Sequence, residues 1–348
     1  MITASIHIVR QFGPVGGMER YVWELTHALA RQGQKVMVVC EKLHEPTTEH
    51  IEVVELGQVK PKPRWLAMLR FSRRVSKFFN TFDRAGWIIH SHERTAVHQV
   101  TTFHGPPILQ RKPKVLDWLS PRIMTWEYLE RRELCADNVQ RVLPNSLPVA
   151  AQLETFYPEA AVKIGAPAYP GVDPLFSTLK KSSDGHTIGF IGKEWKRKGL
   201  DFAVSVISEL RKQDSGISFV VAGPEPDDII HLFKGWPKDS YQLLGWTRAE
   251  DMLPQIDLLI HPAKVEPFGM VMAEANATGI PVLISNLCGI SPLISEEQGS
   301  SLPLGDIKLW AQHCKSLLEQ TELVHNLDLT WADLAQQHIH IYKSLIDV

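Results

Sequence analysis

Short apolar runs alternate with longer amphipathic segments along the first half of the chain. Residues 5–9 form an apolar run of strand length, and residues 18–32 place apolar side chains at the spacing of one helix face. Gly33 follows this helix, and a second apolar run at 35–40 comes directly after it. A strand, a crossover helix and a parallel strand form the repeating unit of a doubly wound sheet. The pattern predicts further buried strands at 51–56, 87–91, 99–104 and 141–145.

The second half of the chain repeats this order of elements. A strand is predicted at 187–191, a loop at 192–199 and a helix at 200–210. The sequence therefore predicts an α/β protein of two Rossmann-like domains that face a central cleft, with ligands beyond the carboxyl ends of the strands. The further strands predicted in this half are 218–223, 241–244, 258–260 and 282–284.

A proline-rich stretch at 166–174, followed by polar residues up to 186, separates the two halves. The length of 348 residues also suits two domains better than a single core. The expected division is an N-terminal domain at 1–168, a linker at 169–185, a C-terminal domain at 186–330 and a terminal helix at 331–348.

Composition and charge narrow the class of protein. Apolar residues make up 44% of the chain, and the formal net charge of −2 gives no general case for nucleic acid binding. The chain has no signal-peptide pattern and no apolar run of about 18 residues, so we expect a soluble, cytoplasmic protein. The four cysteines form no C-x-x-C pair and are expected to be reduced, mostly buried thiols: Cys40, Cys135, Cys288 and Cys314.

The segment 261–275 carries the most informative chemistry. A buried strand leads into it, a loop with proline follows, and a helix is predicted to begin near Phe268 or Gly269. Glu266 then lies before the helix, and Glu274 lies more than one turn inside it. The N–H groups at the start of a helix suit a phosphate, and carboxylates suit pairs of neighbouring hydroxyls. Sugar hydroxyls, a diphosphate and ribose hydroxyls in a row describe a nucleotide sugar.

Positive charge for a departing diphosphate is available in the loop 192–199. Lys193, Arg197 and Lys198 all lie in this loop. The sequence contains no Asp-x-Asp metal signature, and Asp227-Asp228 sits beside a proline in a predicted surface turn. We therefore expect no metal requirement and no other cofactor.

The segment around Glu266 and Glu274 resembles the E-x7-E motif of retaining glycosyltransferases of the GT-B fold, the large family 4 type. The resemblance extends through most of the chain, and the loop at 192–199 is most similar to lipopolysaccharide-core glucosyltransferases of that family. The further pieces of the resemblance are Gly16-Gly17 with Glu19-Arg20, Thr102 to Gly105, Pro144 to Ser146, Pro170 to Asp173 with Phe176, Gly192 to Gly199, Ala222 to Pro224, Leu244 to Trp246 and Gly279 to Val282.

The resemblance implies a role for each matching residue of the second domain. Glu266 would hold hydroxyls of the donor sugar, Glu274 the ribose and Lys198 the diphosphate. Lys193 stands where many members have arginine. A lysine offers a point charge and not the bidentate contact of an arginine, so Arg197 is a second candidate for the phosphate. The remaining donor-binding residues implied are Gly245, near the base, and the backbone N–H groups of Phe268, Gly269 and Met270.

The resemblance assigns the first domain to the acceptor and the second domain to the nucleotide sugar. His104 matches the family histidine near the anomeric carbon and completes the implied catalytic set with Glu266 and Lys198. Gly16 and Gly17 would let the backbone approach the donor phosphate and the acceptor. The terminal helix would pack back on the first domain.

The implied reaction moves a hexose from a nucleoside diphosphate, by default UDP, to a glycan or glycolipid acceptor. It would proceed with retention by front-face attack, in lipopolysaccharide or cell-surface polysaccharide biosynthesis. Two other functions stay open: a sugar-nucleotide epimerase or phosphorylase on the same scaffold, and a catalytically silent nucleotide-sugar-binding subunit. A nicotinamide-dependent dehydrogenase is a remote alternative, because residues 13–17 do not spell G-x-G-x-x-G.

One further segment, Arg64 to Phe79, predicts a basic helix with several large apolar side chains. Basic amphipathic helices can rest on anionic membrane surfaces. In the alternative interpretation the apolar stripe packs on the domain and only the basic side chains face water. We expect the second arrangement for the apolar stripe, together with a peripheral contact on the inner face of a membrane.

Overall fold

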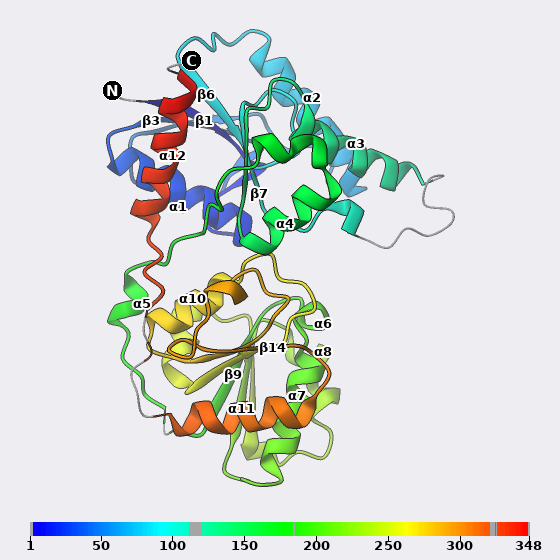
Figure 1. Ribbon diagram of the computed structural model, residues 1–348, viewed down its shortest axis with the longest axis vertical. Coiled ribbons are helices and arrows are strands. Elements are labelled where there is room, and N and C mark those ends of the chain that lie inside the picture. Colours follow the sequence, from blue (N-terminus) through cyan, green and yellow to red (C-terminus); the bar gives the residue numbers. More distant parts are fainter. Residues whose placement is uncertain (1–2, 111–119, 184, 321–323, 325, 347–348) are drawn as a thin grey trace. The chain divides into compact units, whose positions relative to one another are not determined.

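The chain forms two compact units in the computed structural model (Figure 1), which describes residues 3–110, 120–183, 185–320, 324 and 326–346. Unit 1 comprises Met1–Gly171 and Thr330–Val348, and unit 2 comprises Val172–Leu329. Each unit is a parallel β-sheet flanked by helices, so the predicted α/β class with two Rossmann-like domains is confirmed. No helix within the described ranges is long and apolar enough to cross a membrane.

The sheet of unit 1 has six parallel strands in the order β5-β3-β1-β6-β7-β8. The order changes direction between β1 and β6, and in doubly wound sheets this switch point is where ligands bind. Two short strands, β2 and β4, pair beside the sheet. The strands are β1 (Ala4–Ile8), β2 (Gln11–Phe12), β3 (Lys35–Cys40), β4 (Lys42–Leu43), β5 (Ile51–Glu55), β6 (Trp87–Ser91), β7 (Val100–Phe103) and β8 (Arg141–Pro144).

Helices cover both faces of this sheet. On one face, Phe71 and Val75 of α2 pack against Ile6 and Ile8 of β1 in a core that excludes water. On the other face α12, red in Figure 1, lies beside α1, although the two helices stand at opposite ends of the chain. The helices of unit 1 are α1 (Gly17–Arg31), α2 (Arg64–Phe79), η1 (Ile108–Gln110), α3 (Pro121–Cys135), α4 (Leu147–Phe156), η3 (Pro158–Lys163) and α12 (Trp331–Ile346).

The sheet of unit 2 repeats the same topology, with strand order β11-β10-β9-β12-β13-β14 and all strands parallel. Its switch point lies between β9 and β12. The strands are β9 (Thr187–Ile191), β10 (Ser218–Ala222), β11 (Tyr241–Gly245), β12 (Leu258–His261), β13 (Val282–Ser285) and β14 (Gly299–Leu302). The helices are α5 (Leu175–Thr178), α6 (Trp195–Lys198), α7 (Leu200–Arg211), α8 (Pro226–Ile229), η4 (Ile230–Phe233), η5 (Lys238–Ser240), α9 (Ala249–Met252), η6 (Leu253–Gln255), α10 (Met270–Ala277), η7 (Ser291–Leu293) and α11 (Ile307–Glu319).

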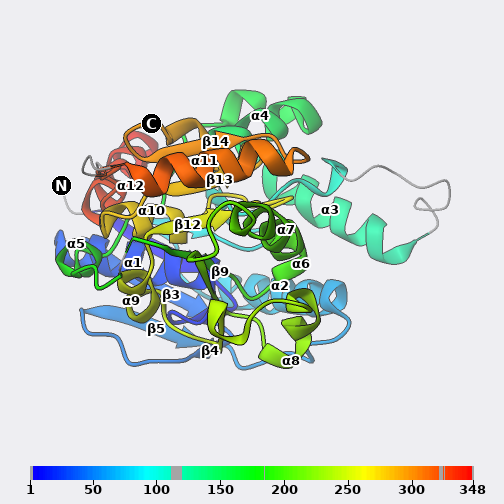
Figure 2. The same cartoon turned by 90° about the horizontal axis from the view of Figure 1, so that it is seen from below.

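The core of unit 2 is anchored by Trp310 of α11, which lies alongside α7 (Figure 2). Trp310 is fully buried, its ring meets Phe202 edge to face, and its Nε1 donates a hydrogen bond of 2.8 Å to the carbonyl of Pro303. A buried indole therefore has both an apolar contact and a partner for its polar atom.

The structure adds elements that the hydrophobic pattern did not predict. The predicted loop 192–199 contains the one-turn helix α6, and the predicted turn at Asp227-Asp228 is part of the short helix α8. Helix α3 was missed because two of its buried positions are carboxylates, Glu130 and Glu133, which break the apolar periodicity. The four cysteines are free; Cys135 is partly exposed and the other three are buried.

Replacing Trp310 by alanine is expected to lower the free energy of unfolding of unit 2 by about 3–5 kcal/mol, because it leaves a large cavity beneath α11. Urea unfolding followed by circular dichroism measures the change. The matched control is Trp246→Ala, since that side chain is 71% exposed and its loss should change stability little. Equal destabilisation by the two substitutions would contradict the described core.

Candidate functional site

The switch point of unit 2 brings together two loops that are far apart in sequence. One follows β9 and contains Gly192 and α6; the other follows β12 and leads to α10. Both loops leave the sheet at the carboxyl ends of neighbouring strands. This is the position at which doubly wound sheets bind their ligands.

An ion pair joins the two loops. Nζ of Lys198 donates a hydrogen bond of 2.8 Å to Oε2 of Glu266, and both side chains are mostly buried. A guanidinium nitrogen of Arg197 lies 3.6 Å from the same carboxylate oxygen. Arg197 is also held by Glu194, at 2.9 and 2.7 Å, and donates to the carbonyl of Val265. The two loops are therefore fixed to one another by charged contacts.

Electrostatics keep the carboxylate of Glu266 ionised. Burial by itself would raise the pKa of Glu266, but the nearby His261 and the charge of Lys198 outweigh that effect and hold the pKa well below its usual range. Nε2 of His261 lies 3.5 Å from the Glu266 carboxylate. Burial, with the charge of Lys198, lowers the pKa of His261 to about 4. At neutral pH the site thus holds a carboxylate, an ammonium and a neutral imidazole.

Gly192 makes room for the Lys198 side chain. A Cβ atom at this position would lie 2.1 Å from Cδ of Lys198 and 3.0 Å from its Cε. A larger residue would push aside the lysine stem as it lies in the structure. The glycine therefore suits the packing of the pair.

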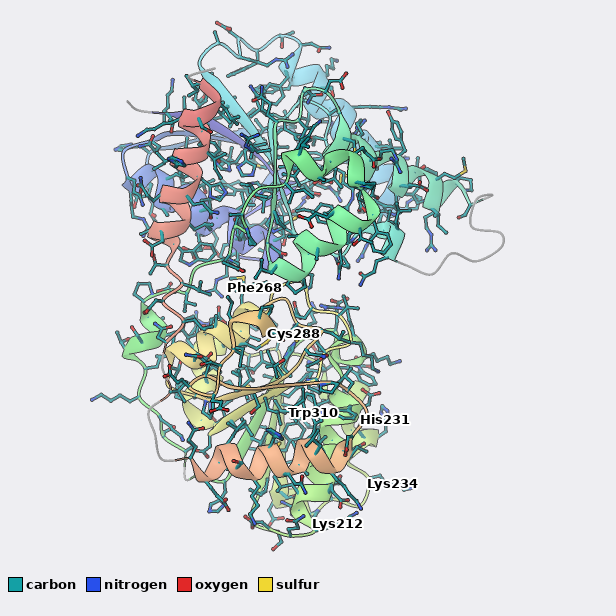
Figure 3. The ribbon with its side chains drawn as sticks, in the orientation of Figure 1. Lys212, His231, Lys234, Phe268, Cys288 and Trp310 are labelled. Atoms are coloured by element: carbon teal, nitrogen blue, oxygen red, sulfur yellow. The ribbon has the colours of Figure 1, made fainter. Side chains whose placement is uncertain are left out.

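The start of α10 adjoins the same carboxylate. Gly269 is the residue before the helix and has φ 111°, a conformation that favours glycine. The carbonyl of Glu266 accepts a hydrogen bond of 2.8 Å from the N–H of Gly289. Glu266 and Cys288 also form an isolated parallel β-bridge. Figure 3 shows Phe268 and Cys288 at the same edge of unit 2, with Lys212 at the far end. The N–H of Met272 donates to the carbonyl of Gly269 at 3.0 Å, and the two N–H groups before it in α10 have no acceptor within the helix.

Glu274 lies inside α10 and is buried, with 3% of its surface exposed. Its carbonyl accepts hydrogen bonds of 3.0 Å from both the N–H and the hydroxyl of Thr278, which help to end the helix. The side chain is therefore carried by a rigid element. This is the second carboxylate that the sequence predicted for the site.

Two further predicted residues lie along the same edge of the sheet. Gly245 ends β11, and its carbonyl accepts a hydrogen bond of 2.7 Å from the N–H of Gly223. Gly223 in turn packs closely on Gly192 and Lys193. Lys193 is exposed, and no ion-pair partner is found for it among the described residues. The loops after β9, β10 and β11 thus lie next to one another, and the first of them carries Lys198 of the ion pair.

Two residues of this site were not predicted from the sequence. His261 ends β12 and Cys288 packs beneath the loop, where burial raises the pKa of its thiol to about 12. The position of His261 at the carboxyl end of a buried strand was a usable signal. Cys288 carries no such signal, because only the folded chain brings it to Glu266.

The predicted residues of the first half lie in unit 1. Gly16 precedes α1 and Gly17 begins it, and both are exposed. His104 follows β7, and its Nε2 lies 3.1 Å from Nδ1 of His92. Burial lowers the pKa of His104 to about 3, with a smaller contribution from His338. The imidazole is therefore neutral at physiological pH.

Each of the two Rossmann-like units contains a segment that matches a family of glycosyltransferase domains. Residues 15–174 match the family described as glycosyltransferase family 4, and residues 185–320 match the glycosyl transferases group 1. The chain belongs to the family 4 type of glycosyltransferases, enzymes that transfer sugars.

Similar proteins support the same family. The D-inositol 3-phosphate glycosyltransferase of Pseudarthrobacter chlorophenolicus is 25% identical over 331 residues, which cover 81% of this chain and 77% of that protein. The crystal structure of WaaG, a glycosyltransferase involved in lipopolysaccharide biosynthesis, has a TM-score of 0.75 at 16% identity, covering 97% of this chain and 95% of that chain. HepE of Anabaena, in complex with UDP-glucose, has a TM-score of 0.69 at 16% identity, covering 99% and 98%. The structural matches show the GT-B fold.

Replacing Glu266 by glutamine is expected to change how stability depends on pH. Because the folded-state pKa is lowered, the carboxylate stabilises the protein above its unfolded-state pKa of about 4.3, and this contribution is lost as the pH falls below that value. The wild type should exceed the variant by about 1.5–3 kcal/mol at neutral pH. The difference should shrink below about pH 4.

Urea unfolding at several pH values measures this difference. Glu194→Gln is the matched control, because its carboxylate also contacts Arg197 but is 68% exposed. We expect that control to stay within about 1 kcal/mol of the wild type at every pH. A Glu266→Gln difference that did not vary with pH would contradict an ionised, stabilising Glu266.

Proposed function

We propose that this chain is a retaining hexosyltransferase that takes its sugar from a nucleoside diphosphate, with UDP as the expected carrier, and delivers it to a glycan or glycolipid. The observation that carries the proposal is the Lys198–Glu266 pair at the switch point of unit 2, next to the start of α10. Carboxylate, ammonium and helix N–H groups are the three kinds of group that a sugar diphosphate needs.

Each charged residue of the site has a task in this proposal. An ammonium has three N–H donors, so Lys198 can keep its bond to Glu266 and donate another to a phosphate oxygen. Glu266 accepts hydrogen bonds from hydroxyls of the sugar, and Glu274, on α10, accepts hydrogen bonds from hydroxyls of the ribose. Lys193 is exposed and can reach a phosphate, whereas the guanidinium of Arg197 already serves Glu194 and Val265. We therefore assign the second phosphate contact to Lys193.

Backbone groups complete the donor site. In the proposal, the N–H groups of Phe268, Gly269 and Met270 face the sugar and phosphates, and the main chain near Gly245 holds the base. HepE was solved with UDP-glucose, which supports a UDP-linked donor. Protein cations, rather than a divalent metal, stabilise the leaving diphosphate.

In the proposal, unit 1 contributes to the reaction through Gly16 and Gly17, which follow β2 at the start of α1, and through His104. A Cβ atom at Gly17 would meet no atom within 4 Å, so the protein itself does not need a glycine there. A glycine at an open position suits close approach by a ligand. We assign Gly16 and Gly17 to the phosphate and the acceptor, and His104 to the region of the anomeric carbon. In front-face attack the leaving phosphate takes the acceptor proton, so a neutral His104 can act as a hydrogen-bonding group.

The acceptor is proposed from the relatives. One acts on an inositol phosphate and another takes part in lipopolysaccharide biosynthesis. A glycan or glycolipid of the cell surface fits the second of these, and we propose a cytoplasmic reaction of that kind. A sugar-nucleotide epimerase would release no free nucleoside diphosphate, and a silent binding subunit would bind the donor without turnover.

A panel of nucleotide sugars tested by thermal shift, with a chelator present, measures the donor and the metal requirement together. We expect UDP-glucose or a related UDP-hexose to raise the melting temperature, because ligand binding to the folded state stabilises it. Lys198→Ala should abolish this shift and lower UDP release by about 10²–10³-fold. Lys196→Ala is the matched control, since Lys196 is exposed and lies over the ring of Trp195.

Two outcomes would contradict the proposal. Full turnover in Lys198→Ala would remove the diphosphate role of that residue. Binding of a UDP-sugar without any UDP release, across glycan and glycolipid acceptors, would favour the silent subunit.

A peripheral membrane contact through α2 is a second, separate proposal. The apolar side of this helix packs inside unit 1, with Met68, Phe71 and Val75 buried, so these side chains are not available for insertion into a bilayer. Arg74 donates hydrogen bonds to the carbonyls of Leu56 and Gly57. The exposed basic side chains left on the helix are Arg64, Arg73 and Lys77.

Reversing two of these charges, Arg73→Glu with Lys77→Glu, is expected to abolish salt-sensitive flotation with anionic liposomes. Each basic residue near such a surface contributes about 1 kcal/mol, so two reversals should reduce binding strongly. The control reverses Lys234 and Lys238, which are exposed on unit 2. If the wild type does not bind anionic liposomes at low salt, the membrane proposal is wrong.

A further inference from the structure

Buried polar side chains of unit 1 form a continuous line that ends at His104. Oγ of Ser5 lies 3.2 Å from Nε2 of His7, and Nδ1 of His7 lies 3.1 Å from Nε2 of His92. Nδ1 of His92 lies 3.1 Å from Nε2 of His104. We call these four residues the histidine chain. It runs from the interior of β1 to the carboxyl end of β7.

The histidine chain is shielded from water and from carboxylates. Ser5, His7 and His92 are each no more than 3% exposed. The titratable and charged groups that face the chain are His90, His98, His338, Tyr21, Tyr342 and Arg94. Burial lowers the pKa of His7 to about 3, and that of His92 is lowered well below its ordinary value for the same reason. The rings are therefore neutral.

A line of neutral imidazoles has only two possible arrangements of its protons. Each neutral ring carries one N–H and one lone pair, so a donor at one end forces the direction of every bond after it. In one direction Nε2 of His104 accepts and its Nδ1 carries the proton. In the other direction Nε2 donates and Nδ1 carries a lone pair.

Ser5 decides between the two directions. Its hydroxyl is buried, and a buried hydroxyl proton needs an acceptor. Among the described residues, the hydrogen-bond acceptor found for this hydroxyl is Nε2 of His7. Ser5 therefore donates to His7, His7 donates from Nδ1 to His92, and His92 donates from Nδ1 to His104. His104 is left as the tautomer that carries its proton on Nδ1.

We propose that Ser5, His7 and His92 are positioning residues that hold His104 in its Nδ1–H tautomer, so that Nδ1 donates a hydrogen bond to a substrate oxygen. No described residue accepts a hydrogen bond from Nδ1 of His104, which is partly exposed. The inference rests on the proposed glycosyl transfer and adds the atom through which His104 acts. In the histidine chain, His92 is hydrogen-bonded to the imidazole of His104. A carboxylate commonly has this orienting role beside a functional imidazole.

The same cluster contains three histidines, His7, His90 and His92, whose ring nitrogens lie within 4.8 Å of one another. Such spacing suits a metal ion, but both nitrogens of His90 are bonded, to Tyr342 at 2.6 Å and to Thr102 at 2.8 Å. The rings of His90 and His92 are also stacked, with 27° between their planes. Stacked rings point their in-plane lone pairs in similar directions and not at one centre. The geometry favours the hydrogen-bonded chain over a metal site.

The test reads the tautomer directly. Long-range proton–nitrogen NMR of the protein carrying isotopically labelled histidine distinguishes Nδ1–H from Nε2–H rings, and His104→Gln assigns the signal of His104. We expect one tautomer, Nδ1–H, in the wild type. Ser5→Ala removes the first donor with little change in packing, and it should convert His104 into a mixture of tautomers although the two residues do not touch.

Kinetics provide the second readout. His92→Phe keeps a buried ring but breaks the chain, and it should lower kcat for UDP release about tenfold or more. The KM for the UDP-sugar should stay unchanged, because the donor-binding residues of unit 2 and the glycines Gly16 and Gly17 are untouched. His98→Phe is the matched control: His98 is equally buried but is bonded to Thr95 and to the carbonyl of Glu133, outside the histidine chain. It should leave the His104 tautomer and kcat unchanged.

Three results would overturn the inference. The first is an unchanged His104 tautomer in both Ser5→Ala and His92→Phe. The second is an Nε2–H tautomer in the wild type. The third is a tetrahedral absorption spectrum on adding Co²⁺ alone to chelator-treated protein, lost in His90→Phe, which would make the cluster a metal site. Failure of the proposed function looks different: the wild type would release no UDP from any UDP-sugar, whatever the tautomer of His104.

Discussion

The ion pair between Lys198 and Glu266 is the contact on which the functional architecture of unit 2 depends. The two residues are 68 positions apart, and they meet because β9 and β12 are neighbours at the point where the strand order changes direction. Desolvating two charges is unfavourable, so such a pair is weak as a source of stability. Its use lies in geometry, since it presents a carboxylate and an ammonium in a fixed arrangement to whatever enters the site. The supporting contacts of Arg197 and the space left by Gly192 serve the same arrangement.

The topology of both sheets follows from local sequence to a large extent. Strands of β-branched and apolar residues joined by amphipathic helices have few alternatives to a parallel sheet. The predicted strands at 87–91 and 187–191 coincide with β6 and β9. Helix α3 escaped prediction because its inner face carries Glu130 and Glu133, whose partners are Arg94 and Thr101. A hydrophobic pattern cannot register a helix that is buried through ion pairs.

The site was predictable as a set of residues but not as a set of contacts. The position of Glu266 before a helix and of Lys198 after a strand can be read from sequence. That the two bond to each other cannot, because strand order is a property of the whole sheet. His261 and Cys288 reach Glu266 for the same reason. The basic helix α2 shows a related limit: its apolar periodicity is the same for a face that packs on a protein as for one that meets a lipid.

Unit 2 concentrates charged groups at its switch point, whereas unit 1 concentrates neutral polar groups. At the switch point of unit 2, the nearby His261 and the charge of Lys198 outweigh burial and keep the pKa of Glu266 low. Unit 1 gathers imidazoles at its own switch point, between β1, β6 and β7, and burial keeps them uncharged. This difference suits the proposed reaction, because a departing diphosphate needs compensating positive charge. In the proposed reaction, Nδ1 of His104 donates a hydrogen bond to a substrate oxygen as a neutral group, and a buried chain of neutral histidines needs no carboxylate whose charge would have to be balanced.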